Sequence, residues 1–152
     1  MRKFDNRGDT AVTLLVFMMV LMTLAALVGE YMRTHTMQTK VEQQLIQASN
    51  VAIEAAMIDS FRQDREGHID YQMAVDVFYS YLKYEMGLDN SFMLYRDDGK
   101  LMYRLEGIDL DFIETPPAIT LKCTLIAPSI FTFFTADIVV PLDIRSKNAR
   151  ID

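Results

Sequence analysis

An uncharged run of twenty residues, Thr10 to Gly29, constrains this chain more than any other feature. A helix rises about 1.5 Å per residue, so the run is long enough to cross a hydrocarbon core of about 30 Å. A buried helix of a soluble domain usually keeps a polar stripe. Here Thr13 and Thr23 are the only polar side chains after the first residue of the run. The run therefore predicts a transmembrane helix near the N-terminus.

A cleaved secretory signal is the main alternative, because Arg2, Lys3 and Arg7 precede the run as the basic region of a signal would. The apolar core of such a signal has about 7–15 residues and is followed by a small-x-small cleavage site. This run is longer, and no Ala-x-Ala pattern ends it. We therefore expect a retained anchor.

Basic residues indicate the orientation of the anchor. Three of them lie in residues 1–9, whereas Arg33 and Lys40 are the only ones close to the other end. The positive-inside rule then places residues 1–9 in the cytoplasm and the chain beyond residues 10–29 outside it. The formal net charge is −6, which argues against a nucleic-acid partner, because such binding needs basic patches.

The helical pattern continues past the predicted span. Residues 30–66 contain no proline or glycine, and apolar side chains recur there at steps of three and four. This spacing predicts an amphipathic helix that continues the span, with Gly67 as its terminator. The residues expected to pack against the sheet of the same chain are Val41, Leu45, Ala48 and Ala52.

Residues 67–152 predict an extracytoplasmic α+β domain. Asp70 is a candidate N-cap for a second helix from Tyr71 to about Met86. The Asp98-Gly99 pair between two apolar runs indicates a β-hairpin. Further strands are expected at residues 108–113, 118–127 and 136–144. The fold class is therefore α+β: a long N-terminal helix, a second helix and a small antiparallel sheet of about four to five strands.

Residues with catalytic chemistry are sparse. His35 and His68 are the only histidines, and they lack metal-ligand partners at helical or strand spacing. The single cysteine, Cys123, alternates with apolar residues, which favours a buried position over a reactive one. Asp109 and Asp111 share one strand face and favour a solvated surface over a cation site. We expect no cofactor, no metal and no enzymatic activity.

The order of segments resembles the type IV pilin-like architecture, and most closely the TadE/TadG-like minor pseudopilins of tight-adherence pili. The matching residues are Arg7, Gly8 and Val12, just before and within the apolar helix. The resemblance implies prepilin-type processing between Gly8 and Asp9. Thr13 would then be the fifth residue of the mature chain.

The same resemblance implies a role for the helix surface inside the membrane. Pilins usually carry a glutamate at the fifth position, which pairs with a neighbour's new amino terminus, and Thr13 cannot supply that charge. This departure indicates a minor subunit. Close helix packing in a bilayer uses small residues. The residues expected to provide it are Ala11, Thr13, Ala25, Ala26 and Gly29.

The sequence therefore predicts a single-pass bacterial cell-membrane protein that acts as a non-enzymatic pseudopilin subunit. Its expected partners are the membrane and other pilin-like subunits or platform proteins of a pilus or type II-like secretion apparatus. The alternative is a membrane-anchored extracytoplasmic ligand-binding or sensory module, since a helix that leads into an α+β domain could also present a ligand pocket.

Overall fold

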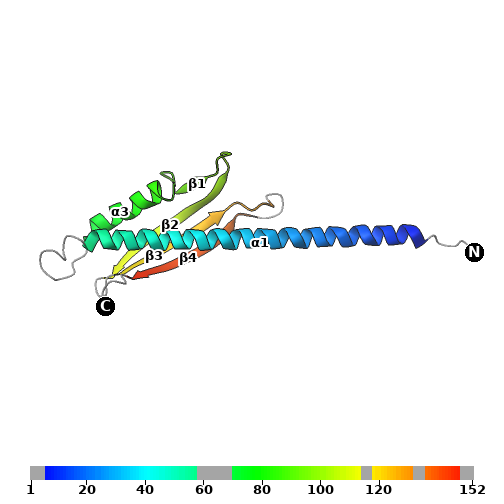
Figure 1. Ribbon diagram of the computed structural model, residues 1–152, viewed down its shortest axis with the longest axis horizontal. Helices are drawn as coiled ribbons and strands as arrows, with labels where there is room; N and C mark the ends of the chain where they lie inside the picture. Colours follow the sequence, from blue (N-terminus) through cyan, green and yellow to red (C-terminus); the bar gives the residue numbers. More distant parts are fainter. Residues whose placement is uncertain (1–5, 58–69, 114–117, 132–135, 148–152) are drawn as a thin grey trace, which may run out of the picture. The chain divides into compact units, whose positions relative to one another are not determined.

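The computed structural model describes residues 6–57, 70–113, 118–131 and 136–147. The chain divides into two compact units, Met1–Thr36 and Met37–Asp152. Its elements are α1 (Asn6–Met57), α3 (Tyr71–Tyr84), β1 (Met93–Tyr95), β2 (Leu101–Ile113), β3 (Ala118–Ala127) and β4 (Ile138–Lys147), as Figure 1 shows. The strands form one antiparallel sheet in the order β1-β2-β3-β4. The expected α+β class is confirmed.

Helix α1 contains both the uncharged run and the amphipathic stretch that follows it. In the second unit, the residues from Met37 to Met57 bury a stripe at steps of three and four. The four residues expected for domain packing are at most 1% exposed: Val41, Leu45, Ala48 and Ala52. The expected end of this helix, residues 58–66 and Gly67, lies outside the described residues.

Helix α3 begins where its capping chemistry predicts. The carboxylate of Asp70 accepts a hydrogen bond from the backbone N–H of Met73 at 3.1 Å, which satisfies one of the free donors of the first turn. The helix buries Ala74, Phe78 and Leu82, which lie four residues apart on one side. It ends at Tyr84, two residues before the expected end.

The sheet has four strands because two segments expected as separate strands form the single strand β2. A β-bulge joins them: the pairing with β3 shifts register between Glu106 and Asp109. Gly107 has a φ of 63° there, a conformation that glycine adopts without a steric penalty. The sequence pattern is interrupted at this glycine, but the strand continues through it.

The core of the second unit lies between one face of the sheet and helices α1 and α3. Strand β3 supplies alternate side chains to this core. The seam of α1, which consists of Val41, Leu45, Ala48 and Ala52, also contributes to it, and its two alanines allow close approach. The residues of β3 in this cluster are Ile119, Leu121, Cys123, Leu125 and Ala127. The opposite face of the sheet carries exposed and half-buried polar residues such as Lys122 and Thr124.

Candidate membrane anchor

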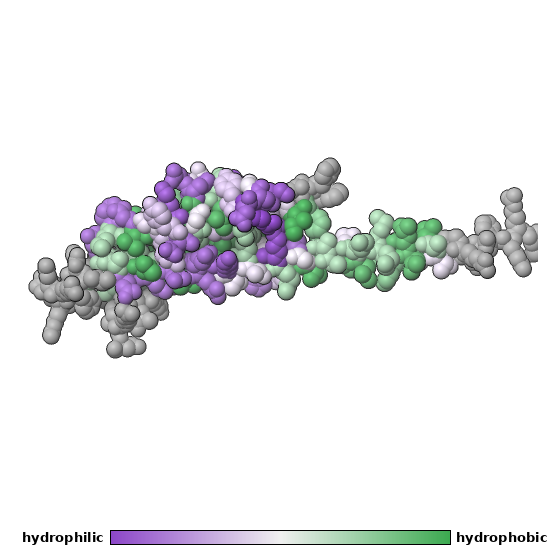
Figure 2. Space-filling view, turned by 45° about the horizontal axis from the view of Figure 1, so that its top comes forward, coloured by the Kyte–Doolittle hydropathy of each residue, from purple (hydrophilic) through white to green (hydrophobic). Residues whose placement is uncertain are grey.

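The first half of α1 leaves its apolar side chains uncovered. The large apolar residues from Val12 to Val28 are between 50% and 71% exposed. Among the described residues, α1 is the one helix that is long and apolar enough to cross a membrane. Figure 2 shows apolar side chains along this part of α1, whereas hydrophilic side chains gather over much of the visible face of the domain. Such a surface is stable in contact with lipid tails and unfavourable in water.

The threonines of α1 are compatible with a lipid environment. The hydroxyl of Thr23 donates to the carbonyl oxygen of Met19 at 2.9 Å. The hydroxyls of Thr34 and Thr36 donate in the same way to the carbonyl oxygens four residues earlier. A hydroxyl that is bonded to its own helix needs no water, so Thr23 carries little penalty within the span.

Charged residues return at Glu30, immediately after the uncharged run. An Arg33 guanidinium nitrogen lies 3.7 Å from Oε2 of Glu30, one helical turn away. The ring of Tyr31 contacts the ring of His35 edge to face, with centroids 6.1 Å apart. Charged and amphipathic aromatic side chains at the end of an apolar helix are typical of a membrane–water interface.

The residues expected for helix packing are distributed around the first half of α1. Ala26 is half-buried, whereas the other four are exposed: Ala11, Thr13, Ala25 and Gly29. Ala25 and Gly29 are four residues apart and therefore share one face. A side chain added at Gly29 would meet nothing within 4 Å, so this position offers room for a neighbour. Gly8 and Asp9 lie in the first turn of α1.

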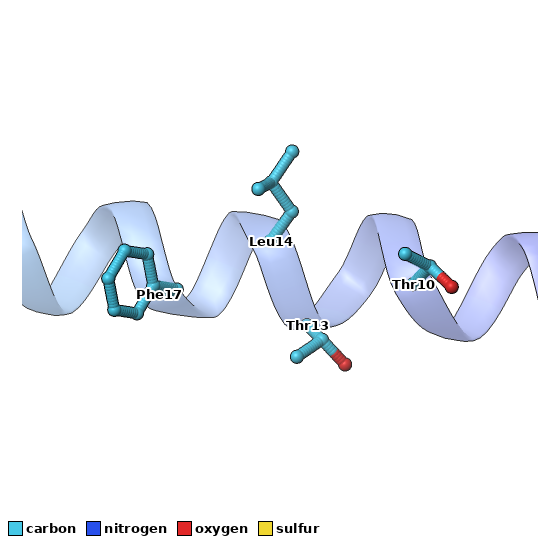
Figure 3. A pocket seen from close by; sticks show the side chains of 4 residues that line it. All are labelled: Thr10, Thr13, Leu14 and Phe17. Atoms are coloured by element: carbon cyan, nitrogen blue, oxygen red, sulfur yellow. The ribbon is translucent and has the colours of Figure 1, made fainter.

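A shallow hollow on α1 is a feature that we did not expect from the sequence. It is lined by Thr10, Thr13, Leu14 and Phe17, which Figure 3 shows along two turns of the helix. The spacing of three and four residues could have indicated it, because such residues border one groove of a helix surface. Thr13 is thus part of a groove with hydroxyl and apolar walls.

The residues that the structure describes contain no group of three or more His, Cys, Asp or Glu side chains that could hold a metal ion. His35 lies on α1, and His68 is outside the described residues. Cys123 is 5% exposed, and its burial raises the pKa of the thiol to about 11, which disfavours the reactive thiolate.

A second hollow lies on the polar face of the sheet, across β2 and β3. It has a volume of about 220 Å³ and is lined by Asp109, Leu110, Asp111, Thr120 and Lys122. The alternation of residues along the chain predicted that the two aspartates share one strand face, but it could not show the neighbouring strand that completes the hollow. The lysine and threonine come from β3, which pairs with β2 at these positions.

Comparisons with protein-family models, with curated proteins and with solved structures give no match.

Proposed function

We propose that this protein is a non-enzymatic minor pilin-like subunit of a bacterial tight-adherence pilus or type II-like secretion apparatus. Residues 10–29 anchor it in the cell membrane, with residues 1–9 in the cytoplasm and the α+β domain outside. The observation that carries the proposal is that one helix, α1, contains both an uncovered apolar segment and the seam of a domain core. A pilin-like subunit needs both, because the same helix crosses the membrane and forms part of the domain core.

The apolar surface supports the anchoring part of the proposal. Burial of apolar surface is worth about 25 cal/mol per Å², so thirteen large side chains left in water would be strongly unfavourable. Lipid tails or neighbouring apolar helices would cover them. Contact with neighbouring helices in a bilayer depends on close packing, which the small residues Ala25 and Gly29 permit on one face of α1.

The pilin-like part of the proposal rests on segment order and on the residues around Gly8. Processing after Gly8 would make Asp9 the first residue and Thr13 the fifth. Because Thr13 carries no charge, it cannot pair with a neighbour's amino terminus. The subunit is therefore a scarce one, placed at the tip or base of an assembly rather than repeated along it.

Cysteine cross-linking in whole cells tests this function. The native thiol is first removed by Cys123→Ala, and then Ala25→Cys places a thiol on the proposed packing face. With the assembly genes expressed, we expect Ala25→Cys to cross-link to other pilin-like proteins that carry a cysteine in their own apolar helices. Asp97→Cys, in the exposed hairpin turn, serves as the control and should give no such products.

Two outcomes would contradict the proposal. The first is a chain that stays monomeric at Ala25→Cys while the other subunits cross-link among themselves. The second is a signalling output that depends on a small ligand and persists without the assembly genes. The second outcome would favour the membrane-anchored binding or sensory module.

A further inference from the structure

The two sides of strand β2 are unequally paired. Strand β3 pairs with it from Arg104 to Ile113, whereas β1 pairs only with its first residues, Leu101–Arg104. The backbone N–H of Leu105 then donates to the carbonyl oxygen of Phe92 at 3.0 Å. Among the described residues, no backbone bond on that side follows it. Within the part of the chain that the structure describes, the side of β2 that faces away from β3 is therefore an unpaired sheet edge from Gly107 to Ile113.

The pairing pattern shows which backbone groups near the bulge point away from β3. Because the Leu105 N–H points to Phe92, the pair Leu105–Leu125 is not hydrogen-bonded. Bonded and non-bonded pairs alternate along an antiparallel ladder. The next pair, Glu106–Thr124, is therefore bonded, and Thr124 directs its backbone groups toward β2.

The same alternation continues beyond the bulge. Lys122 lies two residues before Thr124 and therefore also faces β2, so Asp109, which is opposite Lys122, bonds to β3. Leu110 and Phe112 then direct their N–H and C=O groups to the open edge. These groups can form hydrogen bonds with one further strand.

The side chains of this edge alternate between two kinds. Ile108, Leu110 and Phe112 are half-buried and pack against the core. Asp109 and Asp111 are exposed on the opposite face. A strand added here would continue the core face with apolar residues and would face carboxylates on the other side.

The hollow on the polar face lies against this edge. It is lined by two acidic residues, Asp109 and Asp111, and by one basic residue, Lys122, together with Leu110 and Thr120. Within the described residues, neither aspartate forms an ion pair. The hollow therefore has an excess of negative charge beside unpaired backbone N–H and C=O groups. This combination suits a lysine or arginine side chain of an added strand.

The other edge of the sheet is less suited to pairing. Pro141 of β4 lies opposite Thr124, and Thr124 directs its backbone groups toward β2. The missing N–H of Pro141 therefore falls on the free side of β4. Proline at such a position removes a bond that an added strand would need.

We propose that the open edge of β2, Gly107–Ile113, binds an extended segment of a partner protein in which apolar residues alternate with lysine or arginine. The segment adds a fifth strand, bonds to the backbone of Leu110 and Phe112, and places one basic side chain near Asp109 and Asp111. This mode is β-strand addition, in which backbone bonds give affinity and alternate side chains give specificity. The proposal depends on this edge alone and stands apart from the pilin-like role.

Hydrogen exchange on the full-length chain in non-ionic detergent micelles tests the proposal. The probe is an acetylated, amidated eight-residue peptide that alternates valine with lysine. We expect it to slow exchange of the Leu110 and Phe112 amides at least about tenfold, since both become bonded. The Asp111 amide, which already bonds to β3, should change little. Uniform protection along β2, or none, would overturn the proposal.

Charge substitutions give the second part of this experiment. The double variant Asp109→Lys with Asp111→Lys should bind the peptide about tenfold more weakly, because two cross-strand attractions become repulsions. Asp137→Lys, an equally exposed change just before β4, should leave binding unchanged. A peptide with glutamate in place of lysine should lose binding. Equal affinity in the double variant, or for the glutamate peptide, would contradict the proposed partner chemistry.

Discussion

At the scale of single residues, Ser49 is a polar side chain at a buried position of the core. It is fully buried beside the α1 seam, and its hydroxyl has no hydrogen-bond partner among the described residues. A buried hydroxyl without a partner costs about 1–3 kcal/mol. The residue fits by volume, like its neighbour Ala48, rather than by polarity.

Ser49→Ala should therefore leave the free energy of unfolding unchanged or raise it by about 1 kcal/mol, because it removes an unpaired polar group. Alanine is also the better helix former. Urea unfolding of the full chain in micelles, followed by circular dichroism, measures the effect. Ser80→Ala, at an exposed position of α3, is the control for helix propensity. A clear loss of stability in Ser49→Ala alone would show that the hydroxyl has a partner.

Two buried side chains that lose a proton only at alkaline pH, a tyrosine and a cysteine, predict a loss of stability there. Burial raises the pKa of Tyr103 from 10.0 to about 12 and that of Cys123 from 9.0 to about 11. Above pH 9 the unfolded chain releases these protons while the folded chain still holds them. The unfolded state is then favoured, so stability is complete below pH 9 and falls as the pH rises toward 12.

Thermal unfolding measured from pH 8 to pH 12 should follow this decline. Tyr103→Phe should flatten the part between about pH 10 and 12, since phenylalanine has no proton to release. Tyr84→Phe is the matched control, because Tyr84 is 77% exposed and its replacement should leave the slope unchanged. Identical slopes in both variants would contradict the assignment to Tyr103.

At the scale of elements, the seam of α1 shares one apolar core with residues of the sheet and of α3. Leu45 is 0% exposed and belongs to the cluster that contains the apolar residues of β3. The spacing of four, three and four residues from Val41 to Ala52 places this seam on one side of the helix. Its alanines allow the helix backbone to approach the sheet closely.

Leu45→Ala should destabilise the domain by roughly 2–5 kcal/mol, because it removes buried apolar atoms and leaves a cavity. Gln43→Ala, at an exposed position of the same helix, should change stability by at most about 0.5 kcal/mol. Denaturant midpoints of the two variants, compared with the natural chain, measure both effects. An unchanged midpoint for Leu45→Ala would contradict the packing of this seam.

The sequence predicts elements well where the signal is local. The carboxylate of Asp70 caps α3, and Gly99, with a φ of 78°, lies in the hairpin turn between β1 and β2. The continuity of β2 through Gly107 could not be predicted in this way. A bulge is fixed by the register with the neighbouring strand, and the sequence around Gly107 resembles an ordinary loop.

The candidate sites also differ in how far the sequence alone can predict them. The uncharged run from Thr10 to Gly29 is a signal of composition and length, so the residues alone are enough to recognise it. The open edge of β2 and the hollow at Asp109 depend on which strand lies beside which. A sequence shows the alternation of side chains, but it does not show which side of a strand remains unpaired.

At the scale of the whole molecule, the central claim is that the first half of α1 spans a membrane. Leu21→Arg places a charge near the middle of the proposed span, at a cost of roughly 2.5–3.5 kcal/mol for insertion. The fraction of protein that resists alkaline extraction of membranes should therefore fall. Gln43→Arg makes the same change in charge beyond the span and should leave that fraction unchanged. Equal extraction of the two variants would contradict a central position for Leu21.

The most direct measurement of the central claim is the labelling of single cysteines in intact cells by a membrane-impermeant maleimide. In a Cys123→Ala background, Asp97→Cys reports on the domain. Asp9→Cys reports on the N-terminal side of the span, and it stays in the chain after processing at Gly8 as well as without it. We predict that Asp97→Cys is labelled in intact cells, and that Asp9→Cys is labelled only after the cells are permeabilised. Labelling of both cysteines before permeabilisation, or of neither, would contradict a single span with the domain outside the cytoplasm.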